Sequence, residues 1–106
     1  MRVLKFDVSE LNIEKNPGCD FGGLVPGTEG YLKAEFSFSK EWDGYVRAVS
    51  FYDGVNEYAI ALEDGRSCII PAEATKRPAF GIKVTGKKSN GVMITNRIIV
   101  TQDGGN

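Results

Sequence analysis

Apolar and polar residues alternate along most of the chain, and this two-residue period is typical of β-strands with one buried face. The clearest example is the segment 31–38, in which one side carries Leu32, Ala34, Phe36 and Phe38. Further alternating or apolar runs occupy residues 4–8, 45–52, 55–62, 67–70, 80–85 and 92–101. The pattern therefore predicts about seven strands.

Turn-forming residues separate these runs. Asp53-Gly54 and Asp64-Gly65 each end a run, and Asp-Gly supplies the positive φ angles that tight hairpins need. Residues 87–91 form a polar turn before the last run, and residues 71–75 predict one helical turn that begins with proline. Helix-period patterns are otherwise scarce, so we expect no βαβ crossover and hence no parallel strand pairing.

The segment 9–30 breaks the alternation with three clusters of turn residues, which are Asn16-Pro17-Gly18, Gly22-Gly23 and Val25-Pro26-Gly27. It is predicted to be a long loop with a short strand near residues 11–13. Loops of this length in compact domains are commonly functional or mobile. The end of the chain, residues 102–106, is expected to form a flexible tail.

The spacing of strands and turns predicts one all-β domain over residues 1–106, arranged as an immunoglobulin-like antiparallel β-sandwich. The length of 106 residues suits a single domain with its own hydrophobic core. The term refers to architecture alone, because the paired cysteines and central tryptophan of antibody domains are absent as a set.

The charge balance narrows the choice of partners. Thirteen basic and fourteen acidic residues give a net charge of -1, so neither nucleic acid nor an anionic membrane is expected to bind. No apolar run approaches the about 20 residues of a membrane span, and the N-terminus lacks the apolar stretch of a signal peptide. We expect synthesis in a cytoplasm, where Cys19 and Cys68 are free thiols.

The composition offers little catalytic chemistry. Histidine is absent, which removes the commonest general base and the usual partner of a serine or cysteine nucleophile. Two cysteines without histidine cannot form a zinc site, and no glycine-rich phosphate loop is present. Asp43, Asp53, Asp64 and Asp103 each precede glycine, and turn chemistry explains them better than a glycosidase or calcium site. We expect no enzyme activity, catalytic residue, cofactor or metal.

Aromatic residues are the remaining candidates for a site. We interpret Trp42 as a plug that covers the core at one end of the sandwich. Tyr45, Tyr52 and Tyr58 are candidate interface residues. The alternative is that these rings stack on sugars and that the protein is a carbohydrate-binding module, which the lack of a second tryptophan makes the weaker interpretation.

Five sequence motifs follow one another between residues 31 and 101, and they occupy residues 38–44, 48–51, 68–73, 80–86 and 94–96. This order resembles small β-sandwich modules in virion proteins of tailed bacteriophages that infect Gram-positive hosts. The matching structural positions are Trp42, Asp43, Gly44, Pro71 and Glu73. Ala72 stands where that family has a bulkier residue, and the family module usually leads into a fibre or a second domain, whereas this chain stops at Asn106.

The resemblance implies a non-catalytic structural or attachment module of the virion, which contacts other virion proteins and itself in a tail, baseplate or head-fibre assembly. Without a fibre, a small accessory or decoration protein is favoured. Open sheet edges and the 9–30 loop are the expected contact regions. A small phage inhibitor of a host defence enzyme is the main alternative function.

Overall fold

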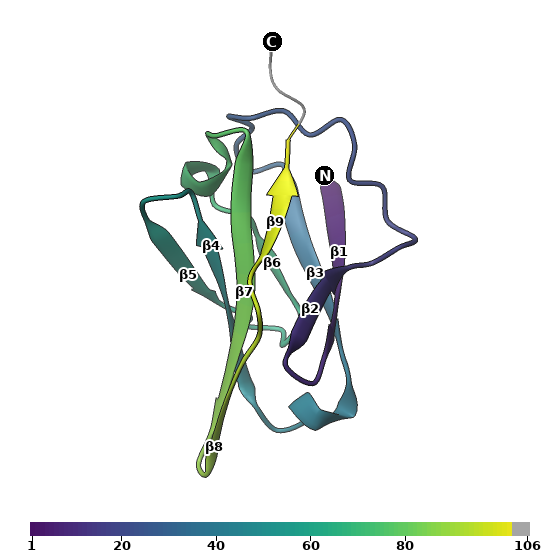
Figure 1. Cartoon of the computed structure of the whole chain (residues 1–106), viewed down its shortest axis with the longest axis vertical. Helices are drawn as coiled ribbons and strands as arrows, with labels where there is room; N and C mark the ends of the chain where they lie inside the picture. Colours follow the sequence, from purple (N-terminus) through teal and green to yellow (C-terminus); the bar gives the residue numbers. More distant parts are fainter. Residues whose placement is uncertain (103–106) are drawn as a thin grey trace.

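The computed structural model describes residues 1–102, and over that range the chain forms nine β-strands and two short 3-10 helices (Figure 1). The strands are β1 Arg2–Ser9, β2 Asn12–Lys15, β3 Leu32–Phe38, β4 Val46–Tyr52, β5 Glu57–Ala61, β6 Ser67–Ile69, β7 Ala79–Lys88, β8 Gly91–Ile94 and β9 Ile98–Thr101. The helices are η1 Lys40–Trp42 and η2 Ala72–Thr75. The predicted all-β class is confirmed, and η2 is the helical turn expected after Pro71.

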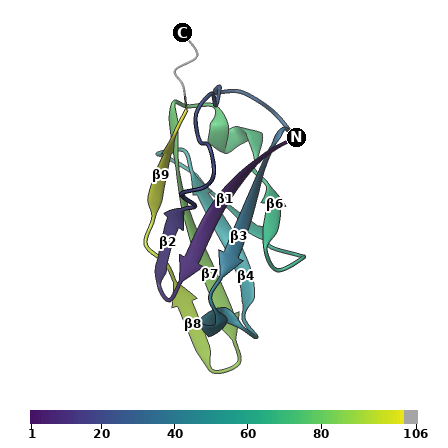
Figure 2. The same ribbon diagram turned by 90° about the vertical axis from the view of Figure 1, so that its right-hand side faces the viewer.

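The strands form two sheets that lie face to face, with the four-stranded sheet in front in Figure 2. Its order is β2-β1-β3-β6. In the five-stranded sheet β5, β4 and β7 are neighbours in that order, and β8 and β9 pair with opposite ends of the remaining edge of β7. The long strand β7 is therefore the centre of the five-stranded sheet.

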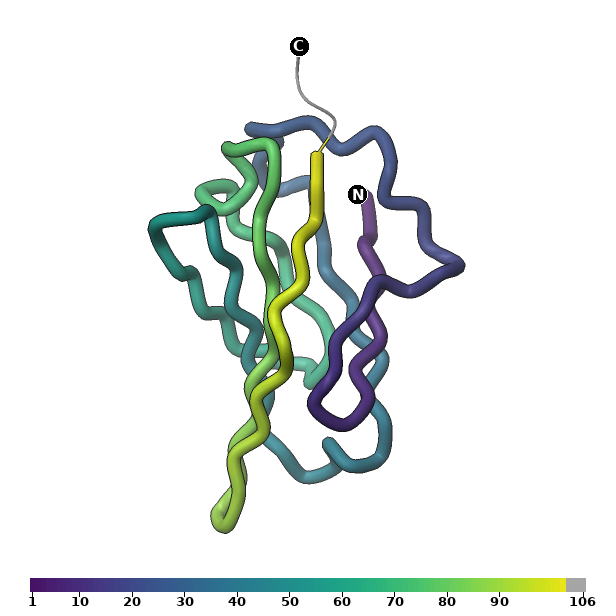
Figure 3. Tube along the Cα trace, in the orientation of Figure 1, coloured from purple at the N-terminus to yellow at the C-terminus, as the bar shows by residue number. Residues whose placement is uncertain are grey.

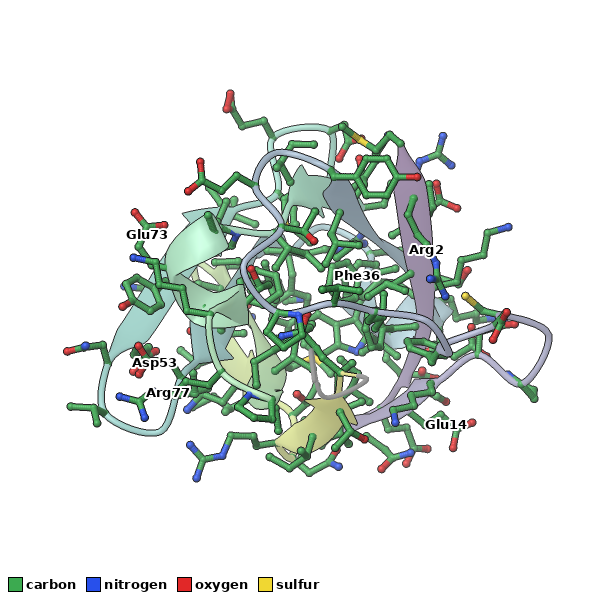
Figure 4. The ribbon with its side chains drawn as sticks, turned by 90° about the horizontal axis from the view of Figure 1, so that it is seen from above. Arg2, Glu14, Phe36, Asp53, Glu73 and Arg77 are labelled. Atoms are coloured by element: carbon green, nitrogen blue, oxygen red, sulfur yellow. The ribbon has the colours of Figure 1, made fainter. Side chains whose placement is uncertain are left out.

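The core fills the space between the two sheets, because alternation turns every second side chain inward. The largest fully buried side chains include Trp42, Phe6, Phe36, Phe51 and Phe80. Phe6 and Phe36 are register partners on β1 and β3, and their rings stack with centroids 5.4 Å apart. Seen from above, Phe36 lies inside the molecule, whereas charged side chains such as Arg2, Glu14 and Arg77 lie at the periphery (Figure 4).

The expectation of purely antiparallel pairing is wrong, because β1 and β3 are parallel from Arg2↔Leu32 to Val8↔Phe38. The chain turns back after β1 to form the short antiparallel strand β2, and residues 16–31 then carry it back to the level at which β1 began. A hairpin arm and a long loop thus provide the crossover that a helix usually provides.

The strand count also exceeds the prediction, partly because the run 92–101 divides into β8 and β9. The backbone N–H of Thr95 donates to the Val84 carbonyl at 3.0 Å, but the N–H of Val84 donates to the Thr95 hydroxyl oxygen at 2.9 Å. A side chain therefore takes the place of a backbone carbonyl, and regular pairing with β7 stops at that point. The other additional strand is β2, close to the predicted short strand at 11–13.

Residues 16–31 run along the outside of the molecule and across one end of it as a well-anchored loop (Figure 3). Leu24 is buried, and the ring of Phe21 packs edge-on against Phe6 with centroids 5.4 Å apart. The Gly27 N–H donates to the Thr75 carbonyl at 2.8 Å. This part of the segment is therefore fastened to the core.

The predicted tail begins later than expected, because Gln102 is buried. Its amide nitrogen donates to the carbonyl oxygens of Thr75 and Arg77 at 2.9 and 2.8 Å. These bonds fasten the end of β9 to the segment around η2. The rest of the predicted tail, residues 103–106, lies outside the described residues.

Candidate functional site

Trp42 closes one end of the space between the sheets, as predicted. Its ring is completely buried, lies 5.3 Å from the Phe38 ring between centroids, and donates its indole N–H to the Glu10 carbonyl at 2.8 Å. Gly86 of β7 leaves room for the ring, since an added Cβ would lie 2.7 Å from a tryptophan ring carbon. A ring without exposed surface cannot stack on a sugar, so the sugar-binding alternative for Trp42 is wrong.

The residues after Trp42 shape the entry into β4. Gly44 has a φ of 83°, a conformation that favours glycine, and Asp43 is exposed beside it. Arg47 fixes this corner from within, because its guanidinium donates to the carbonyl oxygens of Trp42 and Gly65 at 2.8 and 2.9 Å. Trp42, Asp43 and Gly44 therefore belong to one structural corner.

Pro71 and Glu73 lie at η2, far along the chain from that corner. Pro71 has extended backbone and immediately precedes the helix. Glu73 is exposed and points outward from η2 (Figure 4), whereas Ala74 and Thr75 face the core. The five motif positions thus form two separate structural elements and are not brought together into one site.

The three predicted interface tyrosines do not form one patch either. Tyr45 packs against Trp42 with ring centroids 6.0 Å apart. Tyr58 packs against the core, and its hydroxyl donates to Asp53 at 3.1 Å. Of the three, Tyr52 alone lies on the outer surface of a sheet, on the side of β4 opposite to the core residue Phe51.

That outer surface of the five-stranded sheet, called the open face below, is the strongest candidate site. It consists of the residues that alternate with core residues along β4, β5, β7, β8 and β9, together with Arg97, and includes Val46, Ala48, Ser50, Tyr52, Glu57, Ala59, Ala61, Gly81, Lys83, Thr85, Lys87, Val92, Ile94 and Ile99. Most of these side chains are apolar or small. Val46 and Val92 are 76% and 63% exposed, unusual values for large apolar residues on strands.

The outer surface of the four-stranded sheet differs sharply in character. Its outward positions carry charges of both signs on adjacent strands, namely Lys5, Asp7, Glu14, Lys33 and Glu35. Lys5 and Glu35 are register partners and carry opposite charges. Water solvates this charged surface well. On the open face, by contrast, covering the exposed valines and isoleucines with another surface lowers the free energy.

One end of the open face holds a shallow hollow of about 500 Å³, lined by residues of the β4–β5 turn and by Gly81, Arg97 and Ile99. The Arg97 guanidinium lies over the Tyr52 ring, 4.6 Å from its centroid. Gly81 permits this arrangement, because an added Cβ would lie 2.9 Å from the Arg97 Cδ. An isolated glycine within an alternating strand is the sequence signal that would have pointed here.

Glu57 and Asp53 are the two carboxylates that line this hollow. Hydrogen bonds from the Ser50 and Tyr52 side chains lower the pKa of the Glu57 carboxyl, and the nearby cations Lys83 and Arg97 lower this pKa further. Glu57 lies on β5 and the cations lie on the β7 and β9 side. The Glu57 carboxylate and these two cations therefore lie close enough to interact within one molecule.

Asp53 stabilises the β4–β5 turn beside this hollow. Asp53 accepts hydrogen bonds from the backbone N–H groups of Val55 and Asn56 at 2.9 and 2.7 Å, which lower the pKa of its carboxyl to about 2. Asp64 caps the next turn through Arg66 and Ser67 in the same way. The interpretation of these aspartates as turn residues is confirmed, while Asp103 lies outside the described residues.

The thiols have unequal surroundings. Burial raises the pKa of Cys68 to about 12, so its sulfur stays protonated near neutral pH and packs against the core. Cys19 is half-buried in the 16–31 loop. Within residues 1–102, no cluster of three or more acidic, cysteine or histidine side chains could hold a metal ion.

Comparison with known proteins adds no relative, since no protein-family model and no curated protein matches the chain. Over the described residues, no helix has the length and apolar character needed to cross a membrane.

Proposed function

We propose that this protein is a non-catalytic virion module of a tailed bacteriophage, which acts through protein–protein contacts in a tail, baseplate or head-fibre assembly. In this proposal the two facing sheets are an immunoglobulin-like sandwich. The protein is made in the host cytoplasm, becomes part of the virion, and has no substrate to turn over.

The observation that supports a contact function most directly is the open face. Its exposed valines and isoleucines adjoin alanines and a serine, whereas the opposite surface of the molecule is charged. Apolar sheet surfaces of this kind mark interaction sites. The groups around the hollow can bind through charge, hydrogen bonds and apolar contact.

The phage assignment rests on the order of sequence motifs. Two of the motifs that carry the resemblance lie where separate parts of this fold are joined. Trp42 joins the β1–β2 turn to η1, and Asn96 accepts a hydrogen bond from the Ile13 N–H at 2.8 Å, which joins the five-stranded sheet to β2. Their structural role fits motifs that specify a common architecture, and a shared virion function is inferred from that architecture.

Purified phage particles provide the test. We expect the chain to be a stoichiometric component of particles, as measured by quantitative mass spectrometry. Ile94→Asp on the open face should reduce incorporation, whereas Ile69→Asp, which alters an exposed isoleucine of the other sheet, should not. Presence in infected-cell lysate but never in particles would refute the proposal, and capture of a single host enzyme would then favour the inhibitor alternative.

A further inference from the structure

We infer that the free edge of β5 pairs with an extended strand of another protein, which has apolar side chains at alternate positions and basic side chains at its ends. The pairing extends the five-stranded sheet by one strand. The inference rests on the proposed function in one respect, namely that the protein acts through protein–protein contacts. It adds the place of one contact and the chemistry of the partner.

β5 is the outermost strand of its sheet, and no other strand of residues 1–102 lies beyond it (Figure 1). Edge strands are commonly protected from pairing by lysine, proline or a bulge. β5 contains no lysine or proline, and its register with β4 is unbroken over five residue pairs. The edges of the other sheet are less suitable, because β2 bonds to Asn96 and β6 pairs with β3 over only three residues. Opposite β5, the shorter strands β8 and β9 divide the edge between them.

The backbone of β5 presents a row of hydrogen-bonding groups at this edge. The Leu62 N–H donates to the Arg47 carbonyl at 2.9 Å, one register pair beyond the end of β5. Hydrogen-bonded residues alternate along an antiparallel pair, so every second residue of β5 bonds to β4. The residues between them, Glu57, Ala59 and Ala61, direct their N–H and C=O groups outward. All three residues are exposed, so these groups are accessible to an added strand.

The side chains of β5 specify which residues the added strand carries. Tyr58 and Ile60 face the core but are only partly buried, because β5 is the last strand on that side. Side chains of an added strand that lie beside these two residues share their inner face, where burial of apolar groups lowers the free energy. The other side chains lie beside Ala59 and Ala61, which are small enough to leave room for β-branched neighbours. The partner therefore has an apolar residue at every second position.

The charges around β5 favour a basic partner. Residues 53–66, which comprise β5 and the turns on both sides, contain one basic residue and four acidic ones, namely Asp53, Glu57, Glu63 and Asp64. Glu57 interacts with cations of its own molecule, but the other three lie in the turns at the two ends of β5. Glu73 and Arg77, which lie on the same side of the molecule as Asp53, carry opposite charges (Figure 4). Basic side chains at the ends of an added strand thus complement the acidic turns.

A second copy of this chain is a poor occupant of the edge. Antiparallel pairing of two β5 strands about their middle residue brings Asp53 of one copy next to Asp64 of the other. A shift of the centre by one residue in either direction places Glu63 opposite Asp53 or Glu57. Both aspartates are ionised near neutral pH, since hydrogen bonds lower the pKa of each carboxyl to about 2. Like charges at an interface are unfavourable, which favours a basic strand over self-pairing.

A synthetic peptide with blocked ends, Lys-Val-Thr-Val-Thr-Val-Thr-Val-Lys, tests the edge in the intact protein. Its sequence reads the same in both directions, so the result does not depend on strand direction. NMR titration should detect saturable binding, and amide exchange should slow at Glu57, Ala59 and Ala61 in the bound protein. The amides of Tyr58 and Ile60 already bond to β4 and should change little. This alternating pattern distinguishes strand addition from binding to the open face.

A proline substitution tests the backbone contact. Ala59→Pro removes an N–H that faces away from β4, so β5 keeps its bonds within the sheet. It should weaken peptide binding by about tenfold or more, because the proline ring occupies the position of the partner's carbonyl. Ile69→Pro is the matched control and should bind like the wild type, since the Ile70 N–H bonds to the Leu32 carbonyl and the Ile69 N–H therefore faces outward on β6. Slow exchange at Ile60 verifies that Ala59→Pro is folded, and the exchange pattern of the wild type decides the inference if it is not.

Charge reversal tests the chemistry of the partner. A peptide with glutamate in place of both lysines should bind the wild type about threefold or more weakly than the lysine peptide. Glu63→Lys should weaken binding of the lysine peptide by about two- to threefold and strengthen binding of the glutamate peptide, because this exposed side chain lies at the end of the edge. Equal affinity of the two peptides for the wild type would overturn the basic partner.

Absence of peptide binding at millimolar concentration would overturn the inference, and so would full binding by a folded Ala59→Pro variant or binding without slower exchange at the three outward amides. Slower exchange at these amides in the protein alone, as its concentration rises, would make a second copy the occupant and refute the basic partner. The proposed function has a separate outcome, because it depends on the presence of the chain in particles. A stoichiometric particle component whose β5 edge binds no peptide would refute this inference and leave the virion assignment intact.

Discussion

Trp42 joins segments that are distant in the sequence. Its indole N–H bonds to the β1–β2 turn at Glu10, its ring packs against Phe38 of β3 and Tyr45, and it covers Gly86 of β7. A single side chain thereby fixes the distance between the two sheets at this end. The burial of its large ring, together with a satisfied indole N–H, makes it the main stabilising residue of that end.

Truncation of this ring should destabilise the domain strongly. Trp42→Ala removes a fully buried side chain, which typically costs about 3–5 kcal/mol. The melting temperature should fall by roughly ten degrees or more, as measured by differential scanning calorimetry. Tyr31→Ala is the matched control, because that ring is 51% exposed. An unchanged melting temperature combined with lost partner binding would mean that Trp42 belongs to an interface.

The glycine beneath the ring gives a second prediction. In Gly86→Ala the new Cβ would lie 2.7 Å from a Trp42 ring carbon, so overpacking should cost about 1–3 kcal/mol in chemical denaturation. Trp42→Phe shortens the ring and should reduce the effect of Gly86→Ala in a double-mutant cycle. Gly91→Ala is the control, because its nearest neighbour is the movable hydroxyl end of Tyr45. Equal costs in both backgrounds would contradict the contact.

The carboxyl groups of Asp53 and Asp64 make the free energy of unfolding depend on pH. Hydrogen bonds lower the pKa of each carboxyl from 3.8 to about 2 in the folded protein, so the unfolded chain binds protons first as the pH falls. Their stabilisation is complete above about pH 4 and is lost toward pH 2. Asp64→Asn should show a smaller acid-induced fall in melting temperature than the wild type, whereas Glu63→Gln should behave like the wild type. Parallel pH profiles for all three proteins would refute this role.

At the scale of elements, the break between β8 and β9 connects the two sheets. The Asn96 side-chain oxygen accepts from the Ile13 N–H at 2.8 Å, and its backbone N–H donates to the Leu11 carbonyl at 3.2 Å. A single residue thus pairs with β2 as a neighbouring strand would. These bonds add to the pairing of the four-residue strand β2 with β1.

Removal of this side chain should loosen β2 selectively. Asn96→Ala leaves the Ile13 N–H without its acceptor, which should cost about 1–3 kcal/mol. Amide exchange measured by NMR should accelerate at Ile13, with little change in β4 and β7. Asn90→Ala, in the exposed turn between β7 and β8, should leave exchange in β2 unchanged. Unaltered protection of Ile13 in Asn96→Ala would show that the contact is dispensable.

The positions of the strands were easier to predict from the sequence than the way in which the strands pair. Alternation such as that of Leu32 to Phe38 reports a half-buried strand directly, because the side-chain period is two. The parallel pairing of β1 with β3 depends on the path of residues 16–31, which no local pattern encodes. The side-chain hydrogen bonds of Thr95 and Asn96 are tertiary contacts. The division of the predicted strand 92–101 into β8 and β9 therefore could not be predicted from the local sequence either.

The candidate site was predictable only in part. Tyr52 was singled out, but exposed residues such as Val46 and Ile94 come from strands that are far apart in the sequence. Alternation shows that each faces away from the core, and only the sheet order places them on one surface. Gly81 was visible as an irregularity, although its relation to Arg97 requires the folded chain.

At the scale of the whole molecule, the outer surfaces of the two sheets differ in polarity. One outer surface is mostly charged, while the other combines exposed valines and isoleucines with Glu57, Lys83, Lys87 and Arg97. In the proposed function, this surface would set the orientation of the sandwich toward a partner. Buried residues such as Leu24 hold the long loop against the core, so this loop is not a free arm.

The topology also predicts slow folding. The parallel pair joins Arg2 to Leu32, and β4 joins β7 from Val46↔Lys87 onward, so both sheets depend on contacts between distant segments. Closing such long loops precedes most of the stabilising contacts, and domains of this kind fold in milliseconds to seconds. Stopped-flow fluorescence can follow this step, because the single tryptophan, Trp42, contacts both sheets.

A longer loop tests which contact limits the folding rate. Flexible residues inserted at the exposed Gly30, enough to double the length of chain between the register partners Arg2 and Leu32, should cost about 0.6 kcal/mol in loop closure. If β1 and β3 pair in the transition state, refolding should slow by about threefold while unfolding stays unchanged. The same insertion at Asn90, in the β7–β8 turn, should affect refolding less, because that turn lies outside the parallel pair. Refolding in microseconds, or an insertion at Gly30 that changes only the unfolding rate, would show that the β1–β3 pair forms after the limiting step.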